Sequence, residues 1–388
     1  MLERTTGQVD LPYGRSPLRI SCGARDVTIV RATPRPPPPL LSKLLADALA
    51  APVGRPPLAS FARAGLRVTL VVSDPSRAEP RAAFVAAIRD ALPGAVLTVA
   101  IATGTHGPCD LAALGLPGEL LATAVNHDGH ADADLVELGV TPRGTPVRVH
   151  RCVVDTDLVV ATGCIRPHYF AGFGAGVKAI FPGLGEARAI RINHALKTQP
   201  SARAGITVGN PCREDLEDAV SLLDTPTFLV NGVCAPDNEI HAVVAGDLVT
   251  AFRAGADLAR TWFTARAPRA PLVIASDALP VTATLYQAAK IAAAAAPLVE
   301  EDGTLVIAAE CPEGTGPLAT VNEAILRIGV LPRLPPGARL LLVSSMSAET
   351  VATTLVGHCA DLPALLRSTP GPIVVVPRAS QLLLEVTR

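Results

Sequence analysis

Short apolar runs that alternate with alanine- and leucine-rich runs constrain the fold of this chain more than any other feature of its sequence. Apolar runs typical of buried strands occupy residues 67–72, 95–101, 147–154, 157–161, 271–275, 304–308, 339–343 and 372–376. Runs of helical character occupy residues 81–92, 186–196, 283–296 and 318–327. Strands and helices that alternate in this way predict an α/β protein with largely parallel sheets.

The length of the chain predicts two domains. It has 388 residues, whereas single hydrophobic cores stop growing near ~250–300 residues. An arginine-rich polar stretch at residues 260–269 precedes a fresh strand, so we expect an N-terminal domain over residues 1–268 and a C-terminal domain over residues 269–388. The proline-rich stretch at residues 34–39 predicts an extended connector.

Composition and charge argue against several classes of partner. The formal net charge is −1 and only 3% of the residues are aromatic, which does not favour a nucleic-acid surface. The longest alanine-rich run, residues 291–299, is far shorter than the ~20 apolar residues of a membrane span. Residues 1–30 contain no apolar segment of the signal-peptide type. The eight cysteines form no Cys-x-x-Cys pair, so we expect the buried thiols of a cytoplasmic protein.

Polar side chains follow three of the predicted strands, directly at their carboxyl ends. Asp74 and Arg77 follow the first, His106 the second, and Arg166 and His168 the third. In open parallel sheets ligands bind at this edge, so we expect one composite site. Histidine suits proton transfer near neutral pH, with an unperturbed pKa of ~6.5, although a lone histidine is more often structural.

Lys178 ends a glycine-rich run and is one of only four lysines in a chain rich in arginine. A lysine amine can be tuned to act as a nucleophile, whereas arginine cannot lose its proton. The alternative is a point charge that binds an anion, and composition does not separate the two. A phosphate loop is disfavoured, because Val177 and Ala179 replace the glycine and hydroxyl residue that flank the lysine of that motif.

Further candidates are single side chains and pairs of side chains outside these loops. His194 lies in the predicted helix 186–196 as a surface residue or a single metal ligand. Tyr286 and Lys290 are four residues apart and share a helix face, either as a packed pair or as a polar face that closes over the loops of the first domain. His127 and His130 have a metal-like spacing but no third ligand nearby, so we expect them to be solvated.

Several short motifs follow one another in a specific order along the chain. They are Ser73-Asp74-x-x-Arg77, Gly104-Thr-His106, Arg166-Pro-His168-Tyr-Phe-Ala-Gly, Lys178-Ala-Ile-Phe-Pro-Gly, Asn193-His194, Asn210-Pro211, Tyr286-Gln287-x-x-Lys290 and Glu310-Cys311-x-Glu313-Gly314. Each motif alone is weak, but the ordered set, which runs through nearly the whole chain, resembles the nickel-pincer-nucleotide racemases, the lactate racemase family.

The resemblance implies a racemase or epimerase that inverts C2 of a short 2-hydroxy acid, lactate or a close analogue, by hydride transfer. It also implies a cofactor, a pyridinium mononucleotide whose two sulfur-containing substituents and one carbon hold nickel. Transient partners would make this nickel-pincer nucleotide and insert the nickel. The active site would lie at an interdomain cleft.

The resemblance also assigns roles to individual residues. Lys178 would carry the cofactor through a thioamide link, within a loop that includes Gly174 and Gly176. His194 would be the remaining nickel ligand. His106 and His168 would be the two proton-transfer histidines. The substrate would be bound by Arg77 and Lys290, with Asp74, Tyr286 and Gln287 around it.

A few residues depart from the family pattern. Ala175 replaces a glycine in the lysine loop, Val281 and Thr282 replace a Lys-Asp pair, and Ser276-Asp277 replaces a glycine pair. These changes leave undetermined which side chain the 2-hydroxy acid substrate carries. Two other classes compete with a racemase: a nucleotide-dependent transferase, which Val177 disfavours, and a non-catalytic carboxylate-binding protein, which would not need both His106 and His168.

Overall fold

A computed structural model describes residues 1–387 and divides the chain into two compact units. Unit 1 combines residues 1–35 with the chain from Trp262 onward, and unit 2 comprises Pro36–Thr261. This division differs from the expected domains in two ways. The first 35 residues belong to the same unit as the C-terminal part of the chain. The chain returns to that unit at residue 262, instead of entering a new domain at residue 269. The proline-rich stretch around residues 34–39 has no regular secondary structure and spans the first crossing.

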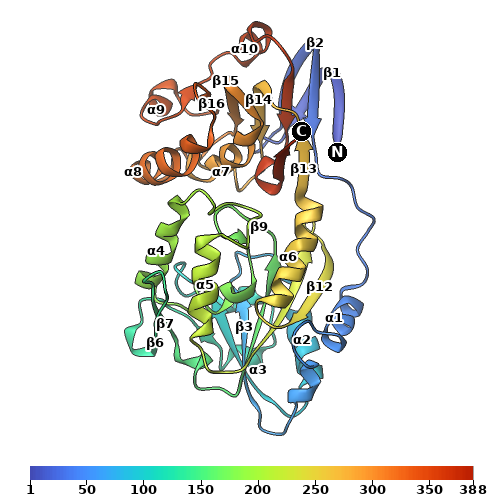
Figure 1. Cartoon of the computed structure of the whole chain (residues 1–388), viewed down its shortest axis with the longest axis vertical. Coiled ribbons are helices and arrows are strands. Elements are labelled where there is room, and N and C mark those ends of the chain that lie inside the picture. The colour runs from blue at the N-terminus through green and yellow to red at the C-terminus, as the bar shows by residue number, and fades with distance from the viewer. Residues whose placement is uncertain (388) are drawn as a thin grey trace. The chain divides into compact units, whose positions relative to one another are not determined.

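Unit 2 contains a six-stranded sheet with the strand order β12-β11-β8-β3-β4-β5, drawn in the lower half of Figure 1. Every neighbouring pair is parallel except β11 with β12. Its elements are α1 (Leu41–Ala50), β3 (Arg67–Ser73), α2 (Arg81–Ala91), β4 (Val96–Ala102), α3 (Gly118–Leu121), β5 (Val125–Asn126), β6 (Leu135–Val140), β7 (Pro146–His150), β8 (Leu158–Ile165), β9 (Pro167–His168), β10 (Gly172–Phe173), α4 (Ala187–Ala195), α5 (Pro211–Ser221), β11 (Thr227–Cys234), β12 (Ile240–Gly246) and α6 (Thr250–Phe263).

The sheet of unit 2 is buried on both faces, as its continuous apolar strands require. Phe84 and Ile88 of α2 join Leu70 and Val160 in one core cluster. On the other face, Gly255 brings α6 so close that an added Cβ would lie 2.6–3.2 Å from side chains of β8, β11 and β12. The carboxyl ends of the central strands are therefore the part of this sheet left for a site.

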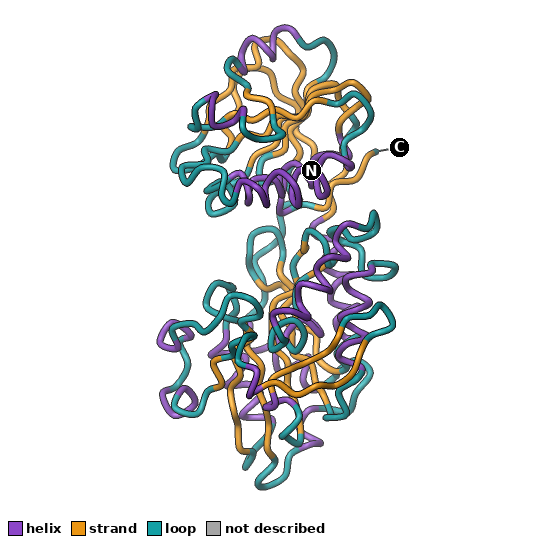
Figure 2. Tube along the Cα trace, turned by 90° about the vertical axis from the view of Figure 1, so that its left-hand side faces the viewer, coloured by secondary structure: helices purple, strands orange, loops and turns teal. Residues whose placement is uncertain are grey.

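Unit 1 contains a seven-stranded sheet with the order β1-β2-β18-β14-β15-β16-β17. Its elements are β1 (Leu2–Leu11), β2 (Leu18–Val30), β13 (Thr264–Ala267), β14 (Ala270–Ser276), α7 (Leu285–Ala295), β15 (Val299–Ala308), α8 (Leu318–Thr320), a π-helical segment (Val321–Val330), β16 (Arg339–Val343), α9 (Ala348–Ala352), β17 (Gly357–His358), α10 (Leu362–Ser368), β18 (Ile373–Val376) and β19 (Leu383–Val386). Figure 2 shows the same strands from the side, in orange.

The predicted α/β class with largely parallel sheets is confirmed. Among the described strands of unit 1 only β1 and β2 pair antiparallel, and β2 joins the sheet through β18 in a parallel register. The predicted strand at residues 147–154 was too long, because β7 ends at His150 and a 3₁₀ turn follows. None of the helices within residues 1–387 has the length and apolarity needed to cross a membrane. The cytoplasmic location stays a prediction.

Candidate active site

A cavity of about 460 Å³ lies at the carboxyl ends of β8, β3 and β4 in unit 2. The three polar loops singled out in the sequence all contribute to its lining. The lining residues that concern us are Asp74, Arg77, Glu79, His106, Thr162, Arg166, His168, Gly174, Lys178 and His194. Seven of the predicted site residues of this unit thus meet at one cavity, while Gly176 lies next to Ala175 in the same loop.

The loop after β3 is held by two buried charged residues that the sequence did not single out. Arg81 donates from Nε to the carbonyl of Ser73 at 2.7 Å, and from its guanidinium to the carbonyls of Asp74 and Arg77. Glu79 accepts hydrogen bonds from the Ser73 N–H, at 2.8 Å, and from the Thr162 hydroxyl. The cavity edges of β3 and β8 are therefore fixed to one another.

His106 and Asp74 are in contact at the mouth of the cavity, with Nδ1 of the ring 3.4 Å from Oδ2 of the carboxylate. Burial alone would raise the pKa of Asp74, but hydrogen bonds from His106 and Ser76 and the charge of Arg77 bring it well below its ordinary value. Asp74 is therefore ionised near neutral pH. A carboxylate on Nδ1 leaves Nε2 of His106 as the nitrogen available for proton transfer.

His168 and Lys178 face each other deeper in the cavity. The Nε2 atom of His168 lies 3.3 Å from Nζ of Lys178. On the other side of the ring, the Ala171 N–H donates to Nδ1 at 3.2 Å. The ring also packs edge-on against Phe170, with a centroid distance of 4.6 Å. The imidazole is thus held at both nitrogens and by its contact with Phe170.

Burial dominates the electrostatics of this pair. It lowers the pKa of Lys178 to about 7, with further contributions from the charges of Arg213 and Arg77. It also holds the pKa of His168 well below its usual value, together with the charge of Lys178. An amine whose pKa lies near the working pH is a feature of catalytic and covalently modified lysines.

Arg213 holds the lysine loop, residues 171–178, in place through hydrogen bonds to the backbone of the loop. This arginine is fully buried and donates from Nε to the carbonyl of Ala171 and from Nη1 to that of Ala175, both at 3.3 Å, and also to the carbonyl of Phe173. Its guanidinium lies 4.1 Å from the ring centroid of Phe252. Burial lowers the pKa of Arg213 to about 10, so it stays charged near neutral pH.

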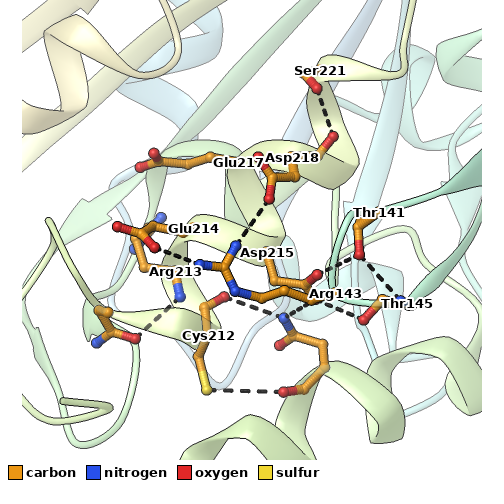
Figure 3. A network of polar contacts seen from close by, with 12 residues as sticks. Thr141, Arg143, Thr145, Cys212, Arg213, Glu214, Asp215, Glu217, Asp218 and Ser221 are labelled. Atoms are coloured by element: carbon orange, nitrogen blue, oxygen red, sulfur yellow. Dashed lines mark hydrogen bonds and ion pairs between the residues drawn. The ribbon is translucent and has the colours of Figure 1, made fainter.

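His194 projects from α4, whose position is set by a buried polar network. Asn193 donates to Oδ2 of Asp215 at 2.8 Å and to the carbonyl of Cys212 at 3.2 Å. Asp215 also accepts hydrogen bonds from the hydroxyls of Thr141 and Thr145, drawn as dashed lines in Figure 3. The network fixes the helical turn that carries His194.

The ring of His194 packs against Phe170, with a centroid distance of 4.9 Å. Its Nδ1 atom is buried and has no hydrogen-bond partner among the described residues. Burial, together with the charges of Lys178 and Lys197, lowers the pKa of His194 to about 3. The ring is therefore neutral near pH 7, and a neutral imidazole is the form that binds a metal.

Ala175, one of the departures from the family pattern, has a positive φ of 64°. A residue with a Cβ is strained in this region, by of order 1–3 kcal/mol. We predict that Ala175→Gly raises the unfolding free energy by about 1 kcal/mol, because glycine relieves this strain but gains more freedom in the unfolded chain. Thermal unfolding of the apo protein measures the change. A lower melting temperature would contradict it.

The remaining predicted substrate contacts lie in unit 1. Tyr286, Gln287 and Lys290 occupy the first turns of α7, where Lys290 donates to the side-chain oxygen of Gln287. Their roles as substrate contacts, and the interdomain position of the active site, remain predictions.

One prediction about the other histidines was wrong. His127, expected to be solvated, is fully buried, and its Nε2 lies 3.1 Å from the carbonyl of Gly185. His130 is exposed, as expected. Residues 1–387 contain no cluster of three or more histidine, cysteine, aspartate or glutamate side chains that would hold a metal by themselves.

Comparison with known proteins gives the same family as the motifs. Residues 13–205 match the model of the lactate racemase N-terminal domain. Lactate racemase of Thermoanaerobacterium thermosaccharolyticum is 28% identical over 322 residues, which cover 79% of this chain and 75% of that protein. The chain belongs to the lactate racemase family. Lactate racemase of Lactiplantibacillus plantarum is 28% identical over 276 residues, 68% of this chain and 65% of that protein.

Membership in the lactate racemase family makes this chain an isomerase, a racemase. Solved structures agree on the fold. The lactate racemase apoprotein of T. thermosaccharolyticum superposes with a TM-score of 0.82 at 24% identity, covering 97% of this chain and all of that one. A protein from Thermotoga maritima shares the fold at a TM-score of 0.63 and 12% identity, covering 91% of this chain and all of that one.

Proposed function

We propose that this racemase inverts C2 of a short 2-hydroxy acid, with lactate as the first candidate. The observation that carries the proposal is the pair of imidazoles at one cavity, each oriented by a different partner. His106 is oriented by the carboxylate of Asp74, and His168 by the N–H of Ala171. The named activity of the two relatives supports lactate as the substrate.

The residues of the cavity fit the nickel-pincer nucleotide implied by the family. Lys178 offers an amine whose pKa is near 7 for a covalent link, and His194 offers a buried imidazole with an unpartnered nitrogen for nickel. When bound, this cofactor would supply an acceptor for the C2 hydrogen and its electron pair, since hydride chemistry belongs to cofactors. The proteins that make the cofactor and insert nickel would be transient partners.

The side chains of the chain would handle the proton and the carboxylate. The hydroxyl groups of the two enantiomers point to opposite sides of C2, so two imidazoles are needed. One takes the hydroxyl proton of the substrate, and the other returns a proton to the oxygen of the mirror product. Each would contribute ~10²–10⁴ in rate. Arg77, exposed at the mouth of the cavity, would bind the carboxylate while the planar 2-keto acid turns.

We predict that the C2 hydrogen does not exchange with water. Starting from one enantiomer of 2-deuterated lactate in ordinary water, the opposite enantiomer should keep its deuterium, because a hydride held away from solvent returns to the same carbon. Mass spectrometry of the product separated on a chiral column measures the label. A racemase that used His106 and His168 to remove C2–H as a proton would place solvent hydrogen in the product. Early loss of the label would therefore refute the hydride step.

A further inference from the structure

The hydrogen bonds around His168 determine where its proton lies. The backbone N–H of Ala171 can only donate, so Nδ1 of His168 must carry a lone pair. In a neutral imidazole the other nitrogen then carries the hydrogen. The burial that holds the pKa of His168 well below its usual value keeps the ring neutral. His168 therefore presents an N–H, at Nε2, to Lys178.

A donor at Nε2 requires an acceptor at Lys178. Nζ lies 3.3 Å from Nε2, and an amine can accept only when it is neutral, because an ammonium group has no lone pair. The structure records no carboxylate within ion-pairing distance of Nζ in the described part of the chain. The two acids that line the cavity have other partners, Asp74 with His106 and Glu79 with Thr162.

Among the remaining charged and titratable groups around Lys178, the two arginines favour its neutral form. Arg213 and Arg77 are cations, and each lowers the pKa of the amine. His194 is neutral above its lowered pKa of about 3. The Cys212 thiol has a pKa raised to about 12 by burial, so it supplies no thiolate near neutral pH.

We propose that His168 acts before catalysis as a positioning residue that holds Lys178 as a neutral amine, so that the apo chain is acylated at Lys178 by an activated acyl donor without a base from a second protein. This inference rests on the proposed function only in taking Lys178 as the attachment residue. It adds an activity of the chain itself, selective capture of an acyl group, and gives His168 a role distinct from proton transfer to substrate.

The acylation step balances without an oxidant or reductant. The hydrogen bond from Nε2 of His168 breaks, and the freed lone pair of Nζ forms a C–N bond to the carbonyl or thiocarbonyl carbon of the donor. The bond from that carbon to the leaving group breaks, and its electron pair departs with the leaving group. The proton that Nζ loses passes to water. A carboxylic acid without activation would not react, so the donor must be an ester, thioester or acyl anhydride.

The experiment is competitive labelling of the apo protein, made without the cofactor-producing proteins. A trace of N-hydroxysuccinimidyl acetate is added over a range of pH, and peptide mass mapping compares labelling at Lys178 and at the exposed Lys43. The rate follows the fraction of neutral amine, which rises as the pH passes the pKa. We expect a midpoint near pH 7 for Lys178, and the exposed Lys43 serves as the reference amine in the same sample. A Lys178 midpoint close to that of Lys43 would overturn the proposal.

Two matched variants test the part played by His168. In His168→Glu a carboxylate replaces the donor and stabilises the ammonium form, so the Lys178 midpoint should rise by at least about one pH unit. His106→Glu adds the same negative charge to the cavity next to Asp74, where no contact with Lys178 occurs, and should shift the midpoint less. Equal shifts in both variants would show that the net charge of the cavity, and not His168, sets the state of the amine.

Thermal unfolding shows whether each variant folds. If a variant does not fold, the Lys178 midpoint of the wild-type protein still tests the proposal. The outcome is also separate from the proposed function. Labelling reports the apo amine with a simple reagent, whereas deuterium retention reports the reaction of the loaded enzyme. A low midpoint with loss of deuterium would leave this inference intact and refute the hydride step.

Discussion

Replacing Lys178 by arginine should reduce racemisation to the uncatalysed background and leave the protein without a covalent adduct. The guanidinium keeps its proton at any working pH, so it cannot attack an acyl carbon, although it preserves a positive charge in the loop. The measurement is racemase activity, together with intact mass and peptide mapping, on protein produced with the cofactor-making proteins. Unmodified Lys178 in active wild-type enzyme would contradict the assignment.

A matched control is Lys43→Arg. Lys43 lies on α1 in the same unit, is exposed, and forms an ion pair with Asp47 at 2.8 Å that arginine can keep. This variant should retain full activity and the adduct on Lys178. Protein made without the cofactor-making proteins should be folded but inactive and unmodified, so it tests the fold and not the mechanism. Full activity of Lys178→Arg would exclude a covalent role for the lysine.

Much of the fold could be predicted because the central strands are continuous apolar runs. β3, β4, β8 and β14 were predicted in this way, since parallel strands covered on both faces have no polar alternation. The position of the site followed from the same pattern, because ligands bind at the carboxyl edge of such sheets. Only local sequence was needed for these inferences.

The N-terminal strands could not be predicted from local sequence. β1 and β2 span Leu2–Leu11 and Leu18–Val30, and many residues of β1 are exposed. Their place in unit 1 depends on the pairing of β2 with β18, more than 300 residues further along the chain. A contact of that range leaves no pattern within either segment. The expected N-terminal domain of residues 1–268 therefore included a strand pair that belongs to the other unit.

The residues that support the site were missed for a related reason. Arg213, Arg81 and Asp215 are buried charged side chains, whereas charged residues are usually exposed. The partners of Arg213 and Asp215 are backbone carbonyls, hydroxyls and an amide contributed by other segments, and those of Arg81 are carbonyls of the loop just before it, which no side-chain pattern reveals. The sequence shows that these residues are charged. It does not show the hydrogen-bond partners that offset the cost of burying them. His127 illustrates the same point, since its polar surroundings in sequence suggested solvent while its Nε2 meets the carbonyl of Gly185.

Alanine substitutions should separate the three histidines of the cavity into two functions. We expect His194→Ala to lose nickel, because it removes the imidazole assigned as the protein ligand. His106→Ala and His168→Ala should retain nickel, counted per Lys178 adduct because His168 also assists the attachment at Lys178, and should lose ~10²–10⁴ in turnover, the usual contribution of a positioned acid or base. Metal analysis and racemase assays of protein made with the cofactor-producing proteins measure both properties.

His130→Ala is the control for the loss of an imidazole as such. His130 belongs to the same unit but is exposed and does not line the cavity, so nickel content and turnover should match the wild type. Thermal unfolding of all four variants shows whether any loss reflects a loss of structure. This check matters most for His194, because its ring packs against Phe170.

The hydrogen bonds of the three rings explain why the two functions should separate. His106 and His168 each have a partner on Nδ1, the carboxylate of Asp74 and the N–H of Ala171. Such contacts orient each ring in the cavity and fix which of its nitrogens carries the hydrogen. Nδ1 of His194 is buried with no such partner, and its ring stays neutral near pH 7 because burial lowers its pKa to about 3. A desolvated neutral imidazole suits a metal better than a proton. Equal loss of nickel in all three variants would show that the cavity as a whole holds the metal and that His194 has no distinct role.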